Sequence, residues 1–186
     1  METKNNNAMN EMLHDKKMLT GLFENASQAE KAYQLLIDKG YAINDISLIM
    51  SDETRNNYYP KPINEVEDES GAVDGAEKGT AIGGTIGITM GAIVGIALAI
   101  GSNIVVPGLG FLISGPLLTG IFGAGTGAIT GGLIGGLMGV GFEEDRAHLY
   151  ETRLKKRNIL IGVHPKIGEK ELIVTAWVAI GGTDIG

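Results

Sequence analysis

The sequence predicts a small α+β domain that is split in two by a membrane hairpin of two glycine-zipper helices. Three observations lead to this prediction. The 64 residues from Gly79 to Phe142 hold no charged residue and no histidine, although the chain has 15 Lys and Arg and 22 Asp and Glu. Short β-rich runs and amphipathic helices flank this stretch on both sides. Within the stretch, glycine recurs at every fourth position.

These observations divide the chain into five regions. Met1 to Lys17 is rich in Asn and charge, without the apolar core of a secretory signal, and is expected to be a disordered N-terminus. The other regions are the first half of a soluble α+β domain (18–50), an acidic linker (51–77), the glycine-zipper membrane hairpin (78–142) and the second half of the soluble domain (143–186).

The first half reads as a strand, a helix and a second strand. We expect a strand over 18–23 and a helix that begins at Ser27, because Ser27 and Glu30 have the spacing of a capping box. Gly40 ends this helix, since glycine suits a left-handed C-terminal cap. Residues 46–50 form the second strand. The helix is supported by apolar residues at helical spacing, namely Ala29, Ala32, Tyr33, Leu36 and Ile37.

The linker carries six acids between Glu65 and Glu77 and no base among them. Two interpretations compete, a weak Ca²⁺ or polyamine site and a solvated spacer. The oxygen ligands lack the fixed spacing of an EF-hand loop, so the spacer is favoured.

The second half begins with a helix over 143–157, which has acids in its first turn and bases in its last, as the helix dipole favours. Residues 159–163 predict a strand and 171–180 a further strand. Trp177 lies on one face of that last strand, and we interpret it as a core or interface residue in preference to a ligand-stacking one. This helix-strand-strand unit and the first half would together make one small sheet covered by two helices.

The charge-free stretch is long enough for two crossings of a bilayer, each of about 20 apolar residues. The candidates are Gly79 to Ile100 and Leu117 to Val140. Residues 101–116 connect them and contain the helix breakers glycine and proline. Asn103 is expected to cap or turn this connection and not to gate a pore. The connection is itself apolar at 104–106 and 111–113, which leaves open whether it dips into the membrane interface.

Glycines spaced by four lie along one face of a helix. In lipid, where hiding leucine gains little, such a face lets two backbones approach closely. A self-packing hairpin and association between copies follow from this interpretation; a soluble oligomeric assembly and a flexible linker are the alternatives. The predicted packing residues are Gly79, Gly83, Gly87, Gly91 and Gly95 in the first helix and Gly123, Gly127, Gly131, Gly135 and Gly139 in the second.

Basic residues predict the orientation. Lys78 precedes the first crossing and Arg146 follows the second, with further bases up to Arg157, whereas the connection has none. The positive-inside rule then places both termini in the cytoplasm. Because both flanks belong to one domain, the number of crossings must be even.

The sequence offers no catalytic or cofactor-binding constellation. Gly123, Gly125 and Ala128 fit the loose dinucleotide pattern, but they lie inside a predicted zipper helix and follow no strand. There is no cysteine, and His148 reads as an ordinary surface histidine. The overall charge of −7 argues against a nucleic-acid groove. We therefore expect no enzyme, no cofactor, no metal and no small-molecule substrate.

The order of these segments along the chain resembles that of a family of bacterial general-stress and low-temperature-induced membrane proteins. The resemblance runs from about residue 18 to 165 and rests on the order of the motifs. It implies a stress-associated membrane protein and carries over no catalytic residue. The segments that support it are Leu19 to Phe23, Ala29 to Ala32, Gly40-Tyr41, Ile46 to Ile49, Val106 to Gly110, Gly141 to Glu144, Tyr150-Glu151 and Ile159 to Val163.

The functional hypothesis is thus a non-enzymatic, stress-associated integral protein of the bacterial cell membrane. We expect its partners to be the lipid bilayer and further copies of itself, which it contacts through its glycine-zipper helices. The alternative is an oligomeric pore or channel-like protein formed by the same glycine faces.

Overall fold

The computed structural model describes residues 17–58, 103–106, 110–123 and 127–186. They form an α+β fold around a five-stranded antiparallel sheet with strand order β1-β5-β2-β4-β3, which confirms the predicted fold class at this level. Along the chain the elements are β1 (Leu19–Phe23), α2 (Ala26–Asp38), a 3₁₀ turn (Ile43–Asp45), β2 (Ile46–Ser51), α3 (Asp52–Tyr58), β3 (Asn103–Val106), β4 (Phe111–Ser114), α6 (Pro116–Gly123), α7 (Gly127–Gly139), α8 (Glu144–Lys155), β5 (Ile159–Val163) and α9 (Lys170–Ile180).

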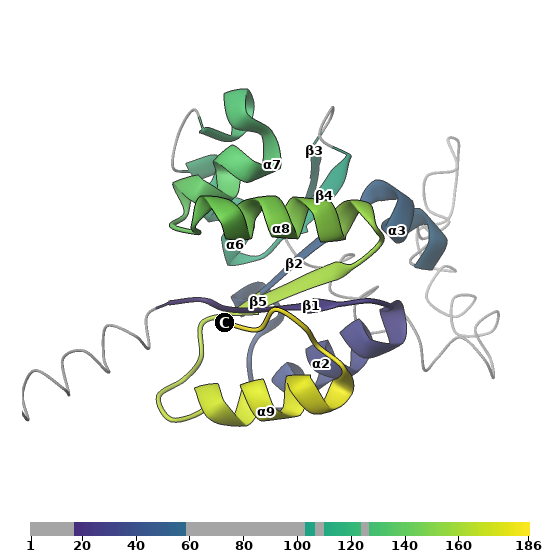
Figure 1. The fold of residues 1–186 in the computed structure, drawn as a ribbon. Coiled ribbons are helices and arrows are strands. Elements are labelled where there is room, and N and C mark those ends of the chain that lie inside the picture. Colours follow the sequence, from purple (N-terminus) through teal and green to yellow (C-terminus); the bar gives the residue numbers. More distant parts are fainter. Residues whose placement is uncertain (1–16, 59–102, 107–109, 124–126) are drawn as a thin grey trace, which may run out of the picture.

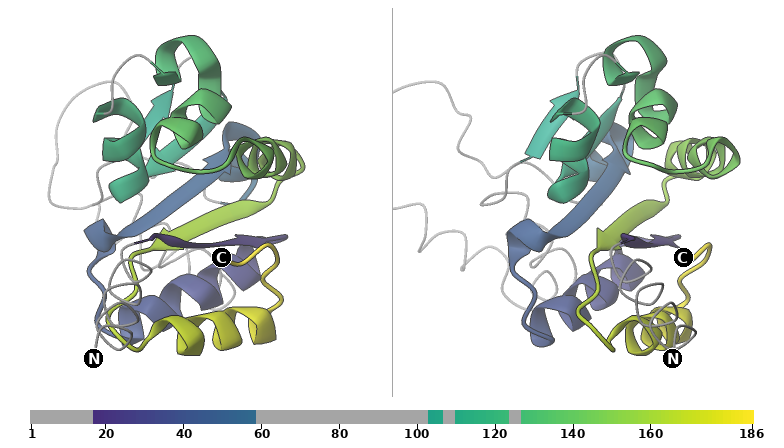
Figure 2. Two further views of the ribbon diagram at one scale, coloured as in Figure 1. Left: turned by 60° about the vertical axis from the view of Figure 1, so that its left-hand side comes forward. Right: turned by 90° about the vertical axis from the view of Figure 1, so that its left-hand side faces the viewer.

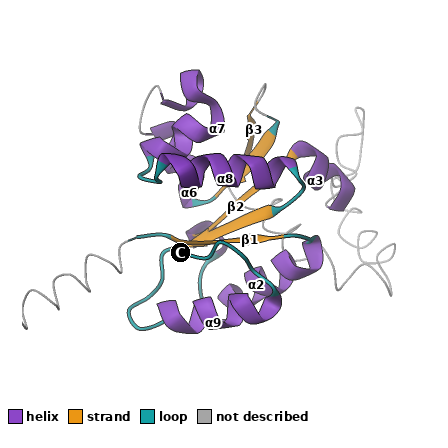
Figure 3. Cartoon of the chain, viewed as in Figure 1, coloured by secondary structure: helices purple, strands orange, loops and turns teal. Residues whose placement is uncertain are grey.

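Helices cover both faces of the sheet, so the domain has three layers (Figures 1 and 2). Helices α2 and α9 pack on one face and α6, α7 and α8 on the other. Side chains alternate along each strand: Leu19 and Phe23 of β1 enter the α2–α9 core, whereas Leu22 enters the opposite core. The strands lie between the two helix layers (Figure 3). Every residue of β1, β2 and β5 is therefore buried, including the polar residues Thr20, Ser47 and Ser51.

Trp177 fills the centre of the α2–α9 core, as expected for a core residue. Its side chain is fully buried, and its ring meets the Phe23 ring edge-on at a centroid distance of 5.6 Å. Gly21 in β1 leaves room for this indole, because a Cβ atom there would lie 2.8 Å from Trp177 Cε3.

The prediction of a strand over 171–180 is wrong, because this segment is helix α9. Its buried residues Ile173 and Trp177 are four positions apart, which matches a helix. Leu172 and Val178, which the predicted strand would have buried together, are each 58% exposed. Gly181 ends the helix with a φ of +97°.

The three elements predicted for the first half are confirmed as β1, α2 and β2, but the helix cap is not the predicted one. The Asn25 side chain accepts a hydrogen bond from the Gln28 backbone at 3.0 Å, so Asn25 caps α2 in place of Ser27. Gly40 has a φ of +76°, as the predicted cap requires. In the second half, α8 and β5 are confirmed as well.

The start of the predicted linker is helix α3, whose first turn is capped by the Ser51 hydroxyl, which accepts from the Thr54 backbone at 3.1 Å. The remainder of the linker, the expected disordered N-terminus up to residue 16 and the first predicted crossing lie outside the described residues.

The predicted membrane hairpin has no support in the structure. The connection forms strands β3 and β4, and β4 pairs with β2, for example Ile113 with Ile49. The second crossing is two helices, α6 and α7, and α7 is interrupted at Gly132 (φ 65°, ψ −152°). In the parts of the chain that the structure describes, no helix is both long and apolar enough to cross a membrane.

Candidate functional site

The predicted packing glycines that the structure describes lie on α6 and α7, and β2 fixes where these helices begin. Gly115 makes the turn into α6 with a φ of +72°, so close to β2 that a Cβ atom there would lie 2.2 Å from the Ile46 carbonyl oxygen. The buried Ser47 hydroxyl accepts a hydrogen bond from the Leu117 backbone at 3.1 Å. The first turn of α6 is therefore tied to the middle of the sheet.

One side of α6 and α7 packs against the sheet. Its leucine and isoleucine side chains are buried beside Ile49 and Ile113 of the strands. Burial of these side chains is the main force that holds the two helices in place. They are Leu117, Leu118 and Ile121 from α6 and Leu133 and Leu137 from α7.

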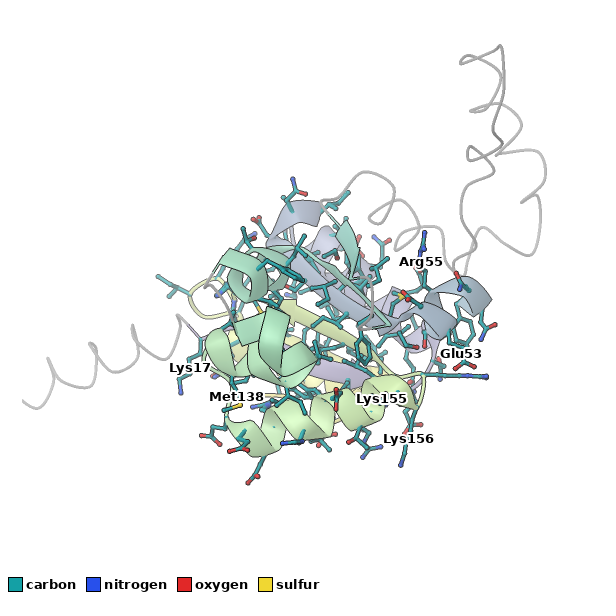
Figure 4. All side chains as sticks on the ribbon, turned by 90° about the horizontal axis from the view of Figure 1, so that it is seen from above. Lys17, Glu53, Arg55, Met138, Lys155 and Lys156 are labelled. Atoms are coloured by element: carbon teal, nitrogen blue, oxygen red, sulfur yellow. The ribbon has the colours of Figure 1, made fainter. Side chains whose placement is uncertain are left out.

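The other side of α7 carries predicted packing glycines and points away from the sheet. We call Gly131, Gly135 and Gly139 the outer glycine face; the break at Gly132 separates the first from the other two, and Gly135 is only partly exposed. Gly131 and Gly139 are exposed, and a Cβ atom added at either would meet nothing within 4 Å. Met138 beside them is 43% exposed and lies at the surface (Figure 4). Within the described domain, Gly131 and Gly139 therefore leave open space at the surface.

The remaining predicted packing glycines add little geometry. Gly123 ends α6 and Gly127 begins α7. The five glycines of the first predicted helix lie outside the described residues. Close packing between the two glycine sets therefore stays a prediction.

A glycine that does permit a close approach was missed. A Cβ atom on Gly120 would lie 2.6 Å from Val140 Cγ1, so this glycine lets the residue after α7 reach α6. Gly120 is outside the four-residue series, and no spacing in the sequence marks it. Gly132 is a break in α7, with a φ and ψ that only glycine adopts readily.

No catalytic arrangement is found among the described residues. No three or more His, Cys, Asp or Glu side chains there are grouped closely enough to hold a metal ion. His148 is exposed and lies 3.9 Å from Glu144 on the same helix. Burial, helped by the nearby charge of Glu30, raises the pKa of Tyr33 well above its usual range, so this phenol stays neutral.

No family model matches the chain, and neither does any curated protein or solved structure.

Proposed function

We propose that this chain is a non-enzymatic, stress-associated protein of the bacterial cell membrane that associates with further copies of itself through the outer glycine face. The observation that carries the proposal is the orientation of α7. Its buried leucines face the sheet, whereas an added Cβ atom at Gly131 or Gly139 would meet none of the described residues within 4 Å. A second apolar helix could approach this backbone closely, because no side chain would keep it away.

The membrane part of the proposal rests on the charge-free stretch and on the resemblance described above. Both ends of the segment between Tyr58 and Asn103 belong to one folded domain, since α3 contacts β2 and β3 pairs in the same sheet. In this proposal both ends of that segment lie on the cytoplasmic side of the bilayer, and both termini are cytoplasmic.

Substitution at Gly131 tests self-association. The site has room within the domain, so Gly131→Leu is expected to leave the fold intact and to weaken association at least tenfold in sedimentation experiments. Gly131→Ala, which adds one methyl group, is the matched control and should associate nearly normally. Loss of association in Gly131→Leu with an unchanged circular dichroism melt supports the outer glycine face. Equal association of both variants and the native chain would exclude it.

Alkaline carbonate extraction of bacterial membranes tests the location. Retention in the pellet, with both termini protected from protease on intact spheroplasts, is the expected result. Release into the supernatant would contradict a membrane-integral protein. Flux of a solute across the membrane of liposomes that contain the protein would favour the pore alternative over the structural role.

A further inference from the structure

The outer edge of β1 is covered by a short segment of the same chain, Thr183–Gly186, which we call the tail (Figure 1). Leu22 and Thr183 exchange two backbone hydrogen bonds of 2.9 Å. Thr20 and Gly186 exchange two more, of 3.3 and 3.0 Å. The tail therefore occupies the place of a further antiparallel strand beside β1.

The tail does not pair with β1 residue for residue. Between the two bonded pairs β1 advances from Leu22 to Thr20, whereas the tail advances from Thr183 to Gly186, one position more. The extra residue is accommodated as in a β-bulge. Asp184, inside this bulge, has a φ of +50°. Asp184 thus has the backbone conformation that glycine tolerates and proline cannot adopt.

Side chains add a second level of recognition. A Cβ atom on Gly21 would lie 2.8 Å from Trp177 Cε3 and 3.4 Å from Ile185 Cγ1, so Ile185 and the indole share the space over this glycine. The Arg146 guanidinium donates to the Asp184 carbonyl oxygen at 3.1 Å. The Arg153 guanidinium also lies 3.9 Å from the Asp184 carboxylate. Apolar and charged side chains therefore contact the tail in addition to the edge of β1.

The groups that receive the tail are organised by the domain itself. The buried Tyr150 hydroxyl lies 2.7 Å from Thr20 Oγ1 and accepts a hydrogen bond from Arg146 Nε at 2.6 Å. Arg146 also lies over the Tyr150 ring, 5.4 Å from its centroid. These residues belong to β1 and α8, and they also donate to the tail: Thr20 Oγ1 donates to the Gly186 carbonyl oxygen at 3.1 Å and the Tyr150 hydroxyl to the Asp184 carbonyl oxygen at 3.5 Å.

The tail lies at the surface of the domain. Asp184 is exposed, and Thr183 and Ile185 are only partly buried. Gly181 and Gly182 join it to α9, and Gly181 has a φ of +97°. Two consecutive glycines can change direction with little strain. The tail could leave β1 by rotation at this joint without disturbing α9.

We propose that the edge of β1 is a peptide-binding site for the sequence Thr183–Gly186, filled by the chain's own tail and also by the tail of a second copy. A second copy can offer the same backbone and side-chain contacts, so the exchange needs no new interface and produces a swapped dimer. Binding by strand addition of this kind takes its affinity from main-chain hydrogen bonds and its specificity from side-chain contacts. This site is independent of the outer glycine face.

Amide hydrogen exchange tests the site in the full-length chain. The Thr20 and Leu22 amides donate to the tail. Successive amides of a strand point to opposite sides, so Gly21 and Phe23 point to β5 and serve as internal references. Asp184→Pro should speed exchange at Thr20 and Leu22 at least tenfold and leave the references unchanged. The control Asp184→Gly, which accepts a positive φ, should change neither.

A synthetic peptide with the sequence Ile180–Gly186 should restore slow exchange at Thr20 and Leu22 of the Asp184→Pro chain. No protection from millimolar peptide would overturn the proposal. If Asp184→Pro also loses protection at the reference amides, the same measurement is made on Ile185→Asp, which removes the apolar contact without constraining the backbone.

Sedimentation of the Asp184→Pro chain mixed with the native chain tests the second copy as the partner. All chains in this experiment also carry Gly131→Leu, which removes the association proposed for the outer glycine face. A one-to-one complex that is absent when both chains carry Asp184→Pro supports the exchange. No complex at several hundred micromolar of each chain would overturn the assignment of a second copy.

Discussion

The close contact between Gly115 and β2 allows a quantitative prediction for Gly115→Ala. A left-handed backbone conformation costs a residue with a Cβ atom about 1–2 kcal/mol. The new Cβ atom would in addition lie 2.2 Å from the Ile46 carbonyl oxygen, so the turn must move away from β2. That movement endangers the Leu117–Ser47 cap, which is worth about 0.5–2 kcal/mol. It also strains the neighbouring Leu48–Ser114 pair, whose backbone hydrogen bonds contribute about 1 kcal/mol each.

Together these terms predict that Gly115→Ala lowers the free energy of unfolding by about 3–5 kcal/mol. Gly110→Ala is the matched control, because Gly110 has a φ of +68° but nothing within 4 Å of an added Cβ atom. It should cost only the backbone strain, about 1–2 kcal/mol. Urea unfolding followed by circular dichroism measures both. Equal losses in the two variants would refute the argument that contact with β2, and not φ alone, demands glycine at position 115.

Three further predictions concern the α2–α9 core. Trp177→Ala should lower the free energy of unfolding by about 3–5 kcal/mol because the indole is fully buried; a loss below 1 kcal/mol in chemical unfolding would contradict this. Asn25→Ala should lower the free energy of unfolding by about 1 kcal/mol and Ser27→Ala by much less, because Asn25 supplies the cap. Thermal melts in which Ser27→Ala is the more destabilising variant would indicate that Ser27 caps the helix. The raised pKa of Tyr33 arises from burial and then from Glu30. The unfolded phenol loses its proton near pH 10 while the folded one keeps it, so stability should fall above that pH, and less steeply in Tyr33→Phe.

The spacing of apolar residues along the sequence predicted an element correctly where that spacing fits either a strand or a helix, but not both. The run from Leu19 to Phe23 is apolar and short, and the apolar residues of α2 recur at helical spacing between a cap and Gly40. The segment 171–180 was ambiguous, because apolar residues occupy most of its positions. Apolar residues at alternate positions suggested a strand, while the spacing of Ile173 and Trp177 fits a helix equally well. The segment is a helix that packs against α2.

The glycine pattern did not predict how α7 packs on the sheet. A spacing of four marks one face of a continuous helix, but it does not predict the break at Gly132 or say whether the face is buried. Leu133 and Leu137 have the same spacing, and they are the residues that contact the sheet. The absence of charged residues does not distinguish a membrane segment from strands and helices that are buried inside a domain, since neither needs charged side chains. Ile104 to Val106 and Phe111 to Ile113 illustrate this, because they extend the sheet through β3 and β4.

The tail on β1 could not have been predicted, because its recognition depends on pairs that are far apart in the sequence. Tyr150 and Thr20 are joined by a hydrogen bond across 130 positions. The local segments that contain these residues do not indicate that they meet. Only the strand order, with β1 beside β5, brings them together.

The strand order also determines when the domain can complete its fold during synthesis. The sole sheet strand that pairs with β1 among the described residues is β5, and Phe23 pairs with Ile159. At about 5–20 residues per second, the ribosome takes roughly 7–30 s to pass from one to the other. During that interval β1 and one side of β2 have apolar side chains and free backbone groups without their native neighbour. A chaperone that shields extended apolar chain would have its greatest effect in this interval, and its removal should cause losses of newly made protein while leaving the finished domain intact.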